Sequence, residues 1–219
     1  MIWGAVLSAG RQAFQRYGAT PQAEAQAVAA AQKLTERFRA LNKNINCVEI
    51  TELDRSSTKM QMATYFLLKG GFFGCCRRVA KYASAALTEI ETSLAELVSE
   101  VPPQPVSCAS LLARKLGASE LHAVMASGFA GGIGLCGGGC GALGAAMWLF
   151  SLERSRAPER KAEFRNPKLE ALVERFLKLT GYRFECSEIV GRTFSDAEDH
   201  AGYLRAGGCA ELLEQLAAG

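Results

Sequence analysis

The chain of 219 residues carries 25 lysine and arginine side chains against 22 aspartate and glutamate side chains, a formal net charge of +3. Apolar residues make up 49% and charged residues 21%, which is typical of a globular protein and excludes a disordered one. No stripe of basic residues with interleaved aromatic residues stands out, so we predict no nucleic-acid partner.

The first residues predict a helix rather than an export signal. Residues 1–7 are apolar, but no positively charged region precedes them, and the helical pattern continues past Phe14. We therefore expect a cytoplasmic protein. In a reducing cytosol its eight cysteines would persist as buried thiols, metal ligands or redox centres rather than as structural disulfides.

Proline and glycine residues mark the limits of further helices. Pro21, directly after Thr20, predicts a helix that runs through Leu41, and Asn166–Pro167 begins another helix in the same way. The apolar stripe of that second helix is Leu169, Leu172, Val173, Phe176 and Leu177. A serine or threonine at 56–58 begins a helix that stops at 70–71, and a last helix follows 207–208. Since no alternating run of strand length is convincing, the sequence predicts an all-α fold.

One segment is long enough to cross a membrane. Residues 126–150 contain no charged side chain. They also contain nine glycines between Gly128 and Gly144, which weaken a continuous helix. We therefore expect a buried glycine-rich turn followed by a helix rather than a membrane contact.

The two sides of a proline-rich stretch resemble each other. The stretch Pro102-Pro103-Gln104-Pro105 indicates a stiff linker. Four landmarks recur in the same order on both sides. Before the stretch they are Glu36-Arg37-Phe38, Cys47-Val48-Glu49-Ile50, Gly70-Gly71 and Cys75. After it they are Glu174-Arg175-Phe176, Cys186-Ser187-Glu188-Ile189, Gly207-Gly208 and Cys209. We predict a tandem repeat of 1–98 and 106–219 joined by the linker 99–105, as two similar helical bundles packed as a pseudo-dimer.

The two predicted copies are unequal. The second has Cys108 and Cys140 upstream of its Glu-Arg-Phe landmark, whereas the counterpart of Cys140 in the first copy would fall just before Met1. We expect the first copy to lack its N-terminal part, either because the start is assigned late or because the segment was lost.

These cysteines carry a family resemblance. Residues 105–219 resemble the C_GCAxxG_C_C family of redox-active proteins, and residues 1–90 share its last two cysteines. Cys108 matches the first cysteine, Gly139-Cys140-Gly141-Ala142-Leu143-Gly144 the GCAxxG core, and Cys186 and Cys209 the last two. Gly141 departs from the alanine of the motif. The resemblance implies redox activity, with these four cysteines as the site and Cys47 and Cys75 as counterparts in the first copy.

The positions of the cysteines suggest reactive thiols. Cys140, Cys209 and Cys75 each follow a glycine and precede an apolar helical run. At a helix N-terminus, free N–H groups and the helix dipole would lower a thiol pKa from ~8.5 into the range of roughly 3.5 to 7.5. Small residues beside Cys140, namely Gly139, Gly141 and Gly144, would let the backbone approach a cofactor closely.

Two uses of these thiols stay open. Cys108, Cys140, Cys186 and Cys209 can together hold zinc or an iron–sulfur centre, or pairs of them can alternate between dithiol and disulfide. The long separations without a C-x-x-C pair count against a metal. Small buried packing residues are the better interpretation for Cys76 and Cys136, which have no counterpart in the other copy.

Two functions from different classes follow. The leading hypothesis is an electron-transfer or thiol-redox protein with a partner protein of matching chemistry. The alternative is a non-catalytic structural or membrane-associated helical protein whose cysteines serve packing. For His200, in a run of acidic residues, we expect a solvated helix face rather than a ligand.

Overall fold

The computed structural model describes residues 1–53, 57–67, 71–98, 100–155 and 166–218, and the side chains of the same ranges up to 153 and from 166. The fold is all-α, as predicted. Within the described ranges, β-pairing is limited to an isolated bridge between Gly139 and Glu185. The helices are α1 (Ile2–Tyr17), α2 (Pro21–Asn42), α3 (Cys47–Thr51), α4 (Lys59–Leu67), α5 (Gly71–Ala95), α6 (Cys108–Lys115), α7 (Glu120–Ser127), α8 (Gly141–Ser155), α9 (Pro167–Leu179), α10 (Cys186–Val190), α11 (Ala197–Arg205) and α12 (Ala210–Ala217).

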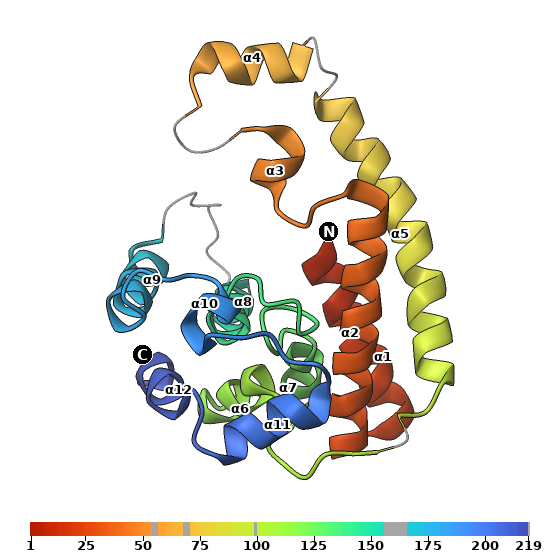
Figure 1. The fold of residues 1–219 in the computed structure, drawn as a ribbon, viewed down its shortest axis with the longest axis vertical. Coiled ribbons are helices and arrows are strands. Elements are labelled where there is room, and N and C mark those ends of the chain that lie inside the picture. The colour runs from red at the N-terminus through yellow and green to blue at the C-terminus, as the bar shows by residue number, and fades with distance from the viewer. Residues whose placement is uncertain (54–56, 68–70, 99, 156–165, 219) are drawn as a thin grey trace.

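The first half is built on α2, which packs between α1 and α5 (Figure 1). The Thr20 side chain accepts a hydrogen bond from the backbone N–H of Ala23, so the predicted cap and proline at the start of α2 are confirmed. Small residues on α1 and α2 allow the helices to approach closely. The core between α1, α2 and α5 includes Val6, Ala27, Leu34 and Ile90, all fully buried.

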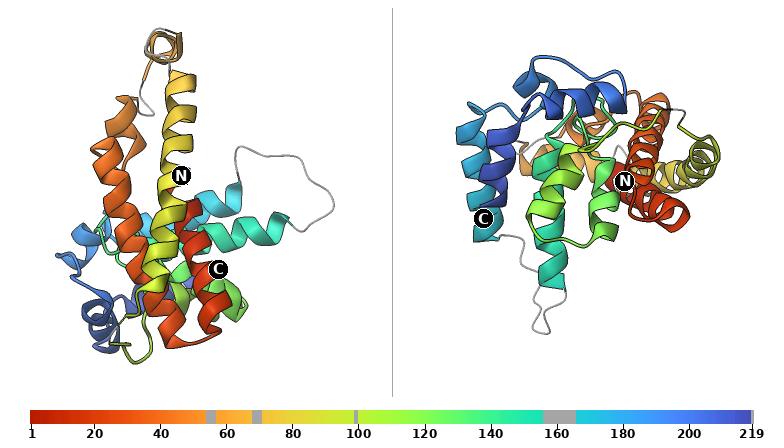
Figure 2. Two further views of the ribbon diagram at one scale, coloured as in Figure 1. Left: turned by 90° about the vertical axis from the view of Figure 1, so that its right-hand side faces the viewer. Right: turned by 90° about the horizontal axis from the view of Figure 1, so that it is seen from below.

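Helices α3 and α4 and the first turns of α5 form one end of the molecule, away from α6 to α12 (Figures 1 and 2). Thr58 caps α4, because its hydroxyl accepts from the backbone N–H of Gln61, which agrees with the predicted start. Large apolar side chains are exposed at this end, with Leu67 81% exposed and Phe73 79% exposed.

The second half packs α6 against α7 and α8, and α12 against α6, α8 and α9. Asn166 caps α9 through its side chain, and Leu172 and Phe176 of the predicted apolar stripe are buried. The last helix begins after Gly208, as expected, and buries Leu213 and Leu216. This half therefore contains an apolar core of its own, and residues of α6, α7 and α8 also join the core that α1, α2 and α5 form.

The uncharged segment 126–150 divides into the end of α7, a glycine-rich loop over 128–140 and most of α8, which confirms the predicted turn followed by a helix. Ile133 and Leu135 adopt positive φ angles of 69° and 60°. Each such residue costs about 1–2 kcal/mol of backbone strain. Hydrogen bonds from Gly134 N to Gly128 O and from Gly137 N to Gly131 O, both 2.9 Å, hold the loop in this form. Among the described helices, none is long and apolar enough to cross a membrane.

The order of helices in the two halves runs in parallel. α3 and α10 each have five residues, begin at a cysteine and end before a residue in the left-handed region, Glu52 or Gly191. α4 and α11 each have nine residues. The halves differ in that α5 has 25 residues and α12 has eight, and α6 and α7 precede only the second set. The tandem repeat and its pseudo-dimer packing stay predictions.

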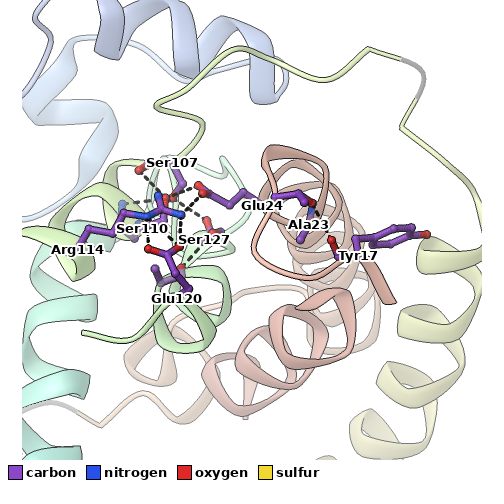
Figure 3. Close-up of polar contacts among 11 residues, drawn as sticks. Tyr17, Ala23, Glu24, Ser107, Ser110, Arg114, Glu120 and Ser127 are labelled. Carbon is purple, nitrogen blue, oxygen red and sulfur yellow. Dashed lines mark hydrogen bonds and ion pairs between the residues drawn. The ribbon is translucent and has the colours of Figure 1, made fainter. Parts of the chain in front are cut away.

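A buried polar network joins the two halves (Figure 3). Glu24 of α2 is 0% exposed, and its carboxylate accepts hydrogen bonds from the Ser110 hydroxyl and from Arg114 Nη2, the latter at 2.6 Å. Arg114 also pairs with Glu120, at 2.9 Å between Nη2 and Oε2. The network fixes α6 against α2, because Ser110 and Arg114 lie on one face of α6.

Candidate redox site

Each of the four family cysteines lies at the start of a helix. Cys108 and Cys186 are the first residues of α6 and α10, Cys140 directly precedes α8, and Cys209 is the N-cap residue of α12. The backbone N–H groups of a first helical turn have no partner within the helix. At Cys108 and Cys140 backbone N–H groups bond to the sulfur, whereas the N–H groups of Cys186 and Ser187 bond to the carbonyl oxygens of Gly138 and Gly137. The position predicted for Cys140 and Cys209 is therefore confirmed, and Cys108 and Cys186 share it.

The start of α6 is fixed by a buried serine. The Ser107 side chain accepts from the N–H groups of Ala109 and Ser110 at 3.2 and 3.4 Å. It also donates to the carbonyl oxygen of Ser127 at 3.0 Å, which ties α6 to the end of α7. Cys108 follows this cap directly and is 8% exposed. Its sulfur is thus held inside the second half by a well-bonded helix start.

Backbone pairing brings Cys140 and Cys186 together. The N–H of Cys186 donates to Gly138 O at 2.7 Å, and the N–H of Cys140 donates to Phe184 O at 3.0 Å. Gly139 and Glu185 form the antiparallel bridge between these two bonds. The end of the glycine-rich loop therefore lies beside the start of α10, although 46 positions separate the two cysteines in the sequence.

The remaining sulfur approaches from the end of the chain. Cys209 has a positive φ of 59°, which turns the chain from α11 into α12. Cys108, Cys140 and Cys209 contact one apolar cluster, whose fully buried members include Leu143 and Phe176. The backbone hydrogen bonds beside Cys140 bring Cys186 to the same region, where burial and, after it, a negative charge on Cys108 raise the pKa of the other three thiols. All four are free thiols in this structure.

Burial decides the ionisation of these thiols. It raises the pKa of Cys140 to about 12 and the pKa of Cys108 and Cys209 to about 11, and it raises the pKa of Cys186 further. Hydrogen bonds from backbone N–H groups do lower the pKa of Cys140, as expected from the sequence, and also that of Cys108. Loss of hydration outweighs them, so the predicted lowering of the pKa at Cys140 and Cys209 is wrong.

The cysteines of the first half lie elsewhere. Cys47 is exposed at the first position of α3. Cys75 is the fifth residue of α5, so its predicted place at the start of a helix is only approximate. Cys76 is exposed, which contradicts its interpretation as a buried packing residue. Cys136 is half-buried, and its thiol donates to Gly132 O at 2.9 Å beside the second-half cluster.

The glycines around Cys140 contact protein atoms. A Cβ at Gly139 would lie 2.8 Å from the Phe184 ring, and one at Gly144 would lie 2.8 Å from the Trp3 ring. At Gly141 it would lie 1.7 Å from a backbone oxygen of the preceding loop. Close packing of loop and helices accounts for all three residues, and their contact with a cofactor stays a prediction.

The four cysteines suit a metal by their chemistry but not by their placement. Thiolates are the soft donors that zinc and iron–sulfur centres take. In the described ranges, however, no group of three or more histidine, cysteine, aspartate or glutamate side chains is placed to hold one ion. The expectation that His200 lies on a solvated helix face is wrong, because the residue is 2% exposed and its Nδ1 lies 3.1 Å from Val106 O. Burial lowers its pKa, so it stays neutral within the core.

Tyr203 belongs to this site and was not anticipated from the sequence. The Cys209 thiol donates to the Tyr203 hydroxyl oxygen, with 4.0 Å between sulfur and oxygen. The Tyr65 hydroxyl lies 3.6 Å from the sulfur of Cys75 in the same way. A tyrosine five or six positions before the second glycine of each Gly-Gly pair is the signal that could have identified both.

Comparison with known proteins agrees with this site. A family model described as "Putative redox-active protein (C_GCAxxG_C_C)" matches residues 106–218, just over half of the chain. The match begins two residues before Cys108 and includes all four cysteines of the second half. No curated protein and no solved structure matches the chain.

Proposed function

Because the chain belongs to the C_GCAxxG_C_C family of redox-active proteins, we propose that Cys108, Cys140, Cys186 and Cys209 act together as one thiol redox centre. In this reaction two thiols lose two electrons and two protons and form a disulfide, and a reductant reverses the step. The observation that supports the proposal is that Cys108, Cys140 and Cys209 contact one apolar cluster, while backbone hydrogen bonds set Cys186 beside Cys140.

Packing alone explains this arrangement poorly. If packing were the only role, a small apolar residue could fill each of the four positions. Four neighbouring thiols instead raise one another's pKa, in addition to the effect of burial. The loop that brings Cys140 to Cys186 also accepts the strain of Ile133 and Leu135. Natural proteins retain such strain mostly where function requires a defined geometry. A structural role for the cysteines gives no reason for this cost.

The raised pKa values describe how the centre would work. At neutral pH each of the four thiols is almost fully protonated, so spontaneous exchange with dissolved disulfides is slow. A thiol-redox or electron-transfer partner protein would supply and remove the electrons. Slow background exchange would keep the centre from losing electrons to disulfides that are not bound beside it.

An iron–sulfur centre is the second candidate. N–H donors at Cys108 and Cys140 suit sulfur atoms that carry negative charge. Such a group, bound by the four cysteines, would supply one-electron transfer. The absence of a single-ion geometry among the described residues favours the dithiol reaction, so thiol chemistry is the primary proposal.

Purification without oxygen, followed by iron, sulfide and zinc analysis and by thiol counting, tests the proposal. We expect little bound metal and four second-half thiols that a mild oxidant converts reversibly to disulfides. Stoichiometric iron and sulfide would replace the dithiol reaction by the second candidate. Thiols that stay reduced under every oxidant, in metal-free protein, would refute a redox function and favour structural cysteines.

A further inference from the structure

We infer that Cys209 is the sulfur through which the redox centre exchanges electrons with a small thiol or disulfide, held in the cavity beside it. This inference rests on the proposed thiol redox function and adds the place of entry and the class of reactant. It also assigns Tyr203 as the residue that positions the reacting sulfur.

A cavity of about 400 Å³ reaches this cysteine. It lies between the end of α9 and the turn from α11 to α12, and its lining includes Thr180, Arg183, Ile189, Tyr203 and Cys209. Cavities of roughly 300 to 1,000 Å³ hold small organic molecules. The other three family cysteines do not line it. Cys108 and Cys186 are 8% and 9% exposed, and Cys140, although half-buried like Cys209, lies outside the lining, so a reactant held in the cavity meets Cys209 first.

Tyr203 is held over Cys209 by its surroundings. Its ring packs on the ring of Phe194, with 5.3 Å between the centroids. A Cβ at Gly208 would lie 2.2 Å from the same ring, so only glycine leaves room for the tyrosine here. When Cys209 is ionised, the hydroxyl of Tyr203 can donate to the thiolate, which favours the reactive form.

The first half contains the same arrangement. The Tyr65 hydroxyl lies 3.6 Å from the sulfur of Cys75, and a Cβ at Gly71 would lie 2.3 Å from the Tyr65 ring. Two stretches of different sequence thus share one arrangement, in which a tyrosine ring packs on a glycine and its hydroxyl contacts a cysteine sulfur. This recurrence supports a role of the tyrosine at the sulfur, since packing of the ring alone does not require a nearby thiol.

The exchange proceeds in two balanced steps. The Cys209 thiolate attacks a disulfide R–S–S–R, forms a mixed disulfide and releases one RS⁻, which takes up the proton lost by Cys209. Cys108 then attacks the Cys209 sulfur, releases the second RS⁻ with the Cys108 proton, and completes a Cys108–Cys209 disulfide. Cys108 is suited to this step because it contacts the same apolar cluster, and α6 packs against α12. The external disulfide is reduced by two electrons, and the cysteine pair is oxidised.

Trapping of the mixed disulfide tests the inference. The full chain, with Cys47, Cys75, Cys76 and Cys136 replaced by serine to remove background thiols, is reduced and treated with hydroxyethyl disulfide. The reaction is then quenched in acid, and the adducts are mapped by mass spectrometry. We expect the first adduct on Cys209. In the Cys108→Ser variant this adduct should persist at least about tenfold longer, because the second step is lost.

Cys209→Ser should slow oxidation of the other three family cysteines by about tenfold or more, and circular dichroism should show unchanged helix content. Oxidation at the original rate without Cys209, or a first adduct on Cys108, Cys140 or Cys186, overturns the inference and leaves the redox function standing. If no disulfide forms with any oxidant, both proposals fail.

Tyr203→Phe separates a role at the sulfur from a packing role. It keeps the ring but removes the hydroxyl, so we expect the pH profile of adduct formation on Cys209 to move to higher pH. Tyr182→Phe, at an exposed tyrosine outside the cavity lining, is the matched control and should leave the profile in place. An unchanged profile in Tyr203→Phe refutes its positioning role.

Discussion

Replacing Glu24 with alanine tests whether the buried network in Figure 3 holds the two halves together. The Glu24 carboxylate is 0% exposed and joins α2 to α6 through Ser110 and Arg114. The substitution removes the carboxylate and leaves its partners in place. We therefore expect a loss of stability and a loosened start of α6, where Cys108 lies.

The partners that remain set the size of the loss. Breaking a fully buried ion pair costs about 3–5 kcal/mol, because the other charge is left unpaired. Here Arg114 keeps Glu120, and the Ser110 hydroxyl can donate its one proton to Ser107 O, 3.0 Å away, so neither is left without a partner. The loss then corresponds to the charged hydrogen bond from Arg114 to Glu24 and the hydrogen bond from the neutral Ser110 hydroxyl. Together these contribute about 3 kcal/mol to the free energy of unfolding.

Urea denaturation followed by circular dichroism measures this value. Glu120→Ala is the matched control, because its side chain is 50% exposed and such pairs contribute about 0–1 kcal/mol. Alkylation of Cys108 should also become faster in Glu24→Ala than in the control. If Glu24→Ala stays within about 0.5 kcal/mol of the parent protein, the network does not stabilise the packing of the two halves.

Three further predictions follow from the geometry. Since burial raises the pKa of Cys140 to about 12, the free energy of unfolding of the reduced protein should fall as the pH rises above about 9, and Cys140→Ser should flatten that fall in urea titrations. Gly141→Ala should cost at least about 3 kcal/mol, since its Cβ would lie 1.7 Å from a backbone oxygen, whereas Gly4→Ala, with open space, should be neutral or stabilising in the same assay. Arg192 holds the pKa of Asp199 at about 2, so Arg192→Ala should raise that pKa in an NMR titration and remove stability that the parent protein keeps until the pH falls below about 4. The first argument fails if the free energy of unfolding falls with pH as steeply in Cys140→Ser as in the parent protein. The second fails if the two glycine variants lose equal stability, and the third fails if the pKa of Asp199 does not move.

Local signals in the sequence determined where several helices begin. Thr20–Pro21 and Asn166–Pro167 place a capping side chain before a residue whose φ already suits a helix, and both starts are confirmed. Glycine density in 128–140 likewise predicted a turn, because those residues lose most entropy in a helix. These features depend on neighbours in the chain, so they can be read without the fold.

The ionisation of the cysteines depended on the tertiary structure. The sequence placed Cys140 and Cys209 beside helix starts, where N–H groups favour thiolate, and it could not show the apolar cluster that removes their water. His200 was misjudged for the same reason, because its acidic neighbours along the chain suggested a solvated face, whereas its ring is buried against Phe194 and Val106 O. Hydration is a property of the packed molecule rather than of a segment.

The sequence by itself determined the all-α class, the four family cysteines and the expectation that they act together. Only the tertiary structure decided how they meet: the bridge between Gly139 and Glu185, the Ser107 cap and the turn at Cys209. It also decided which sulfur faces a cavity and which tyrosine contacts it. Helix propensity and motif spacing act over a few residues, whereas these contacts join segments that only the packing of the whole chain brings together.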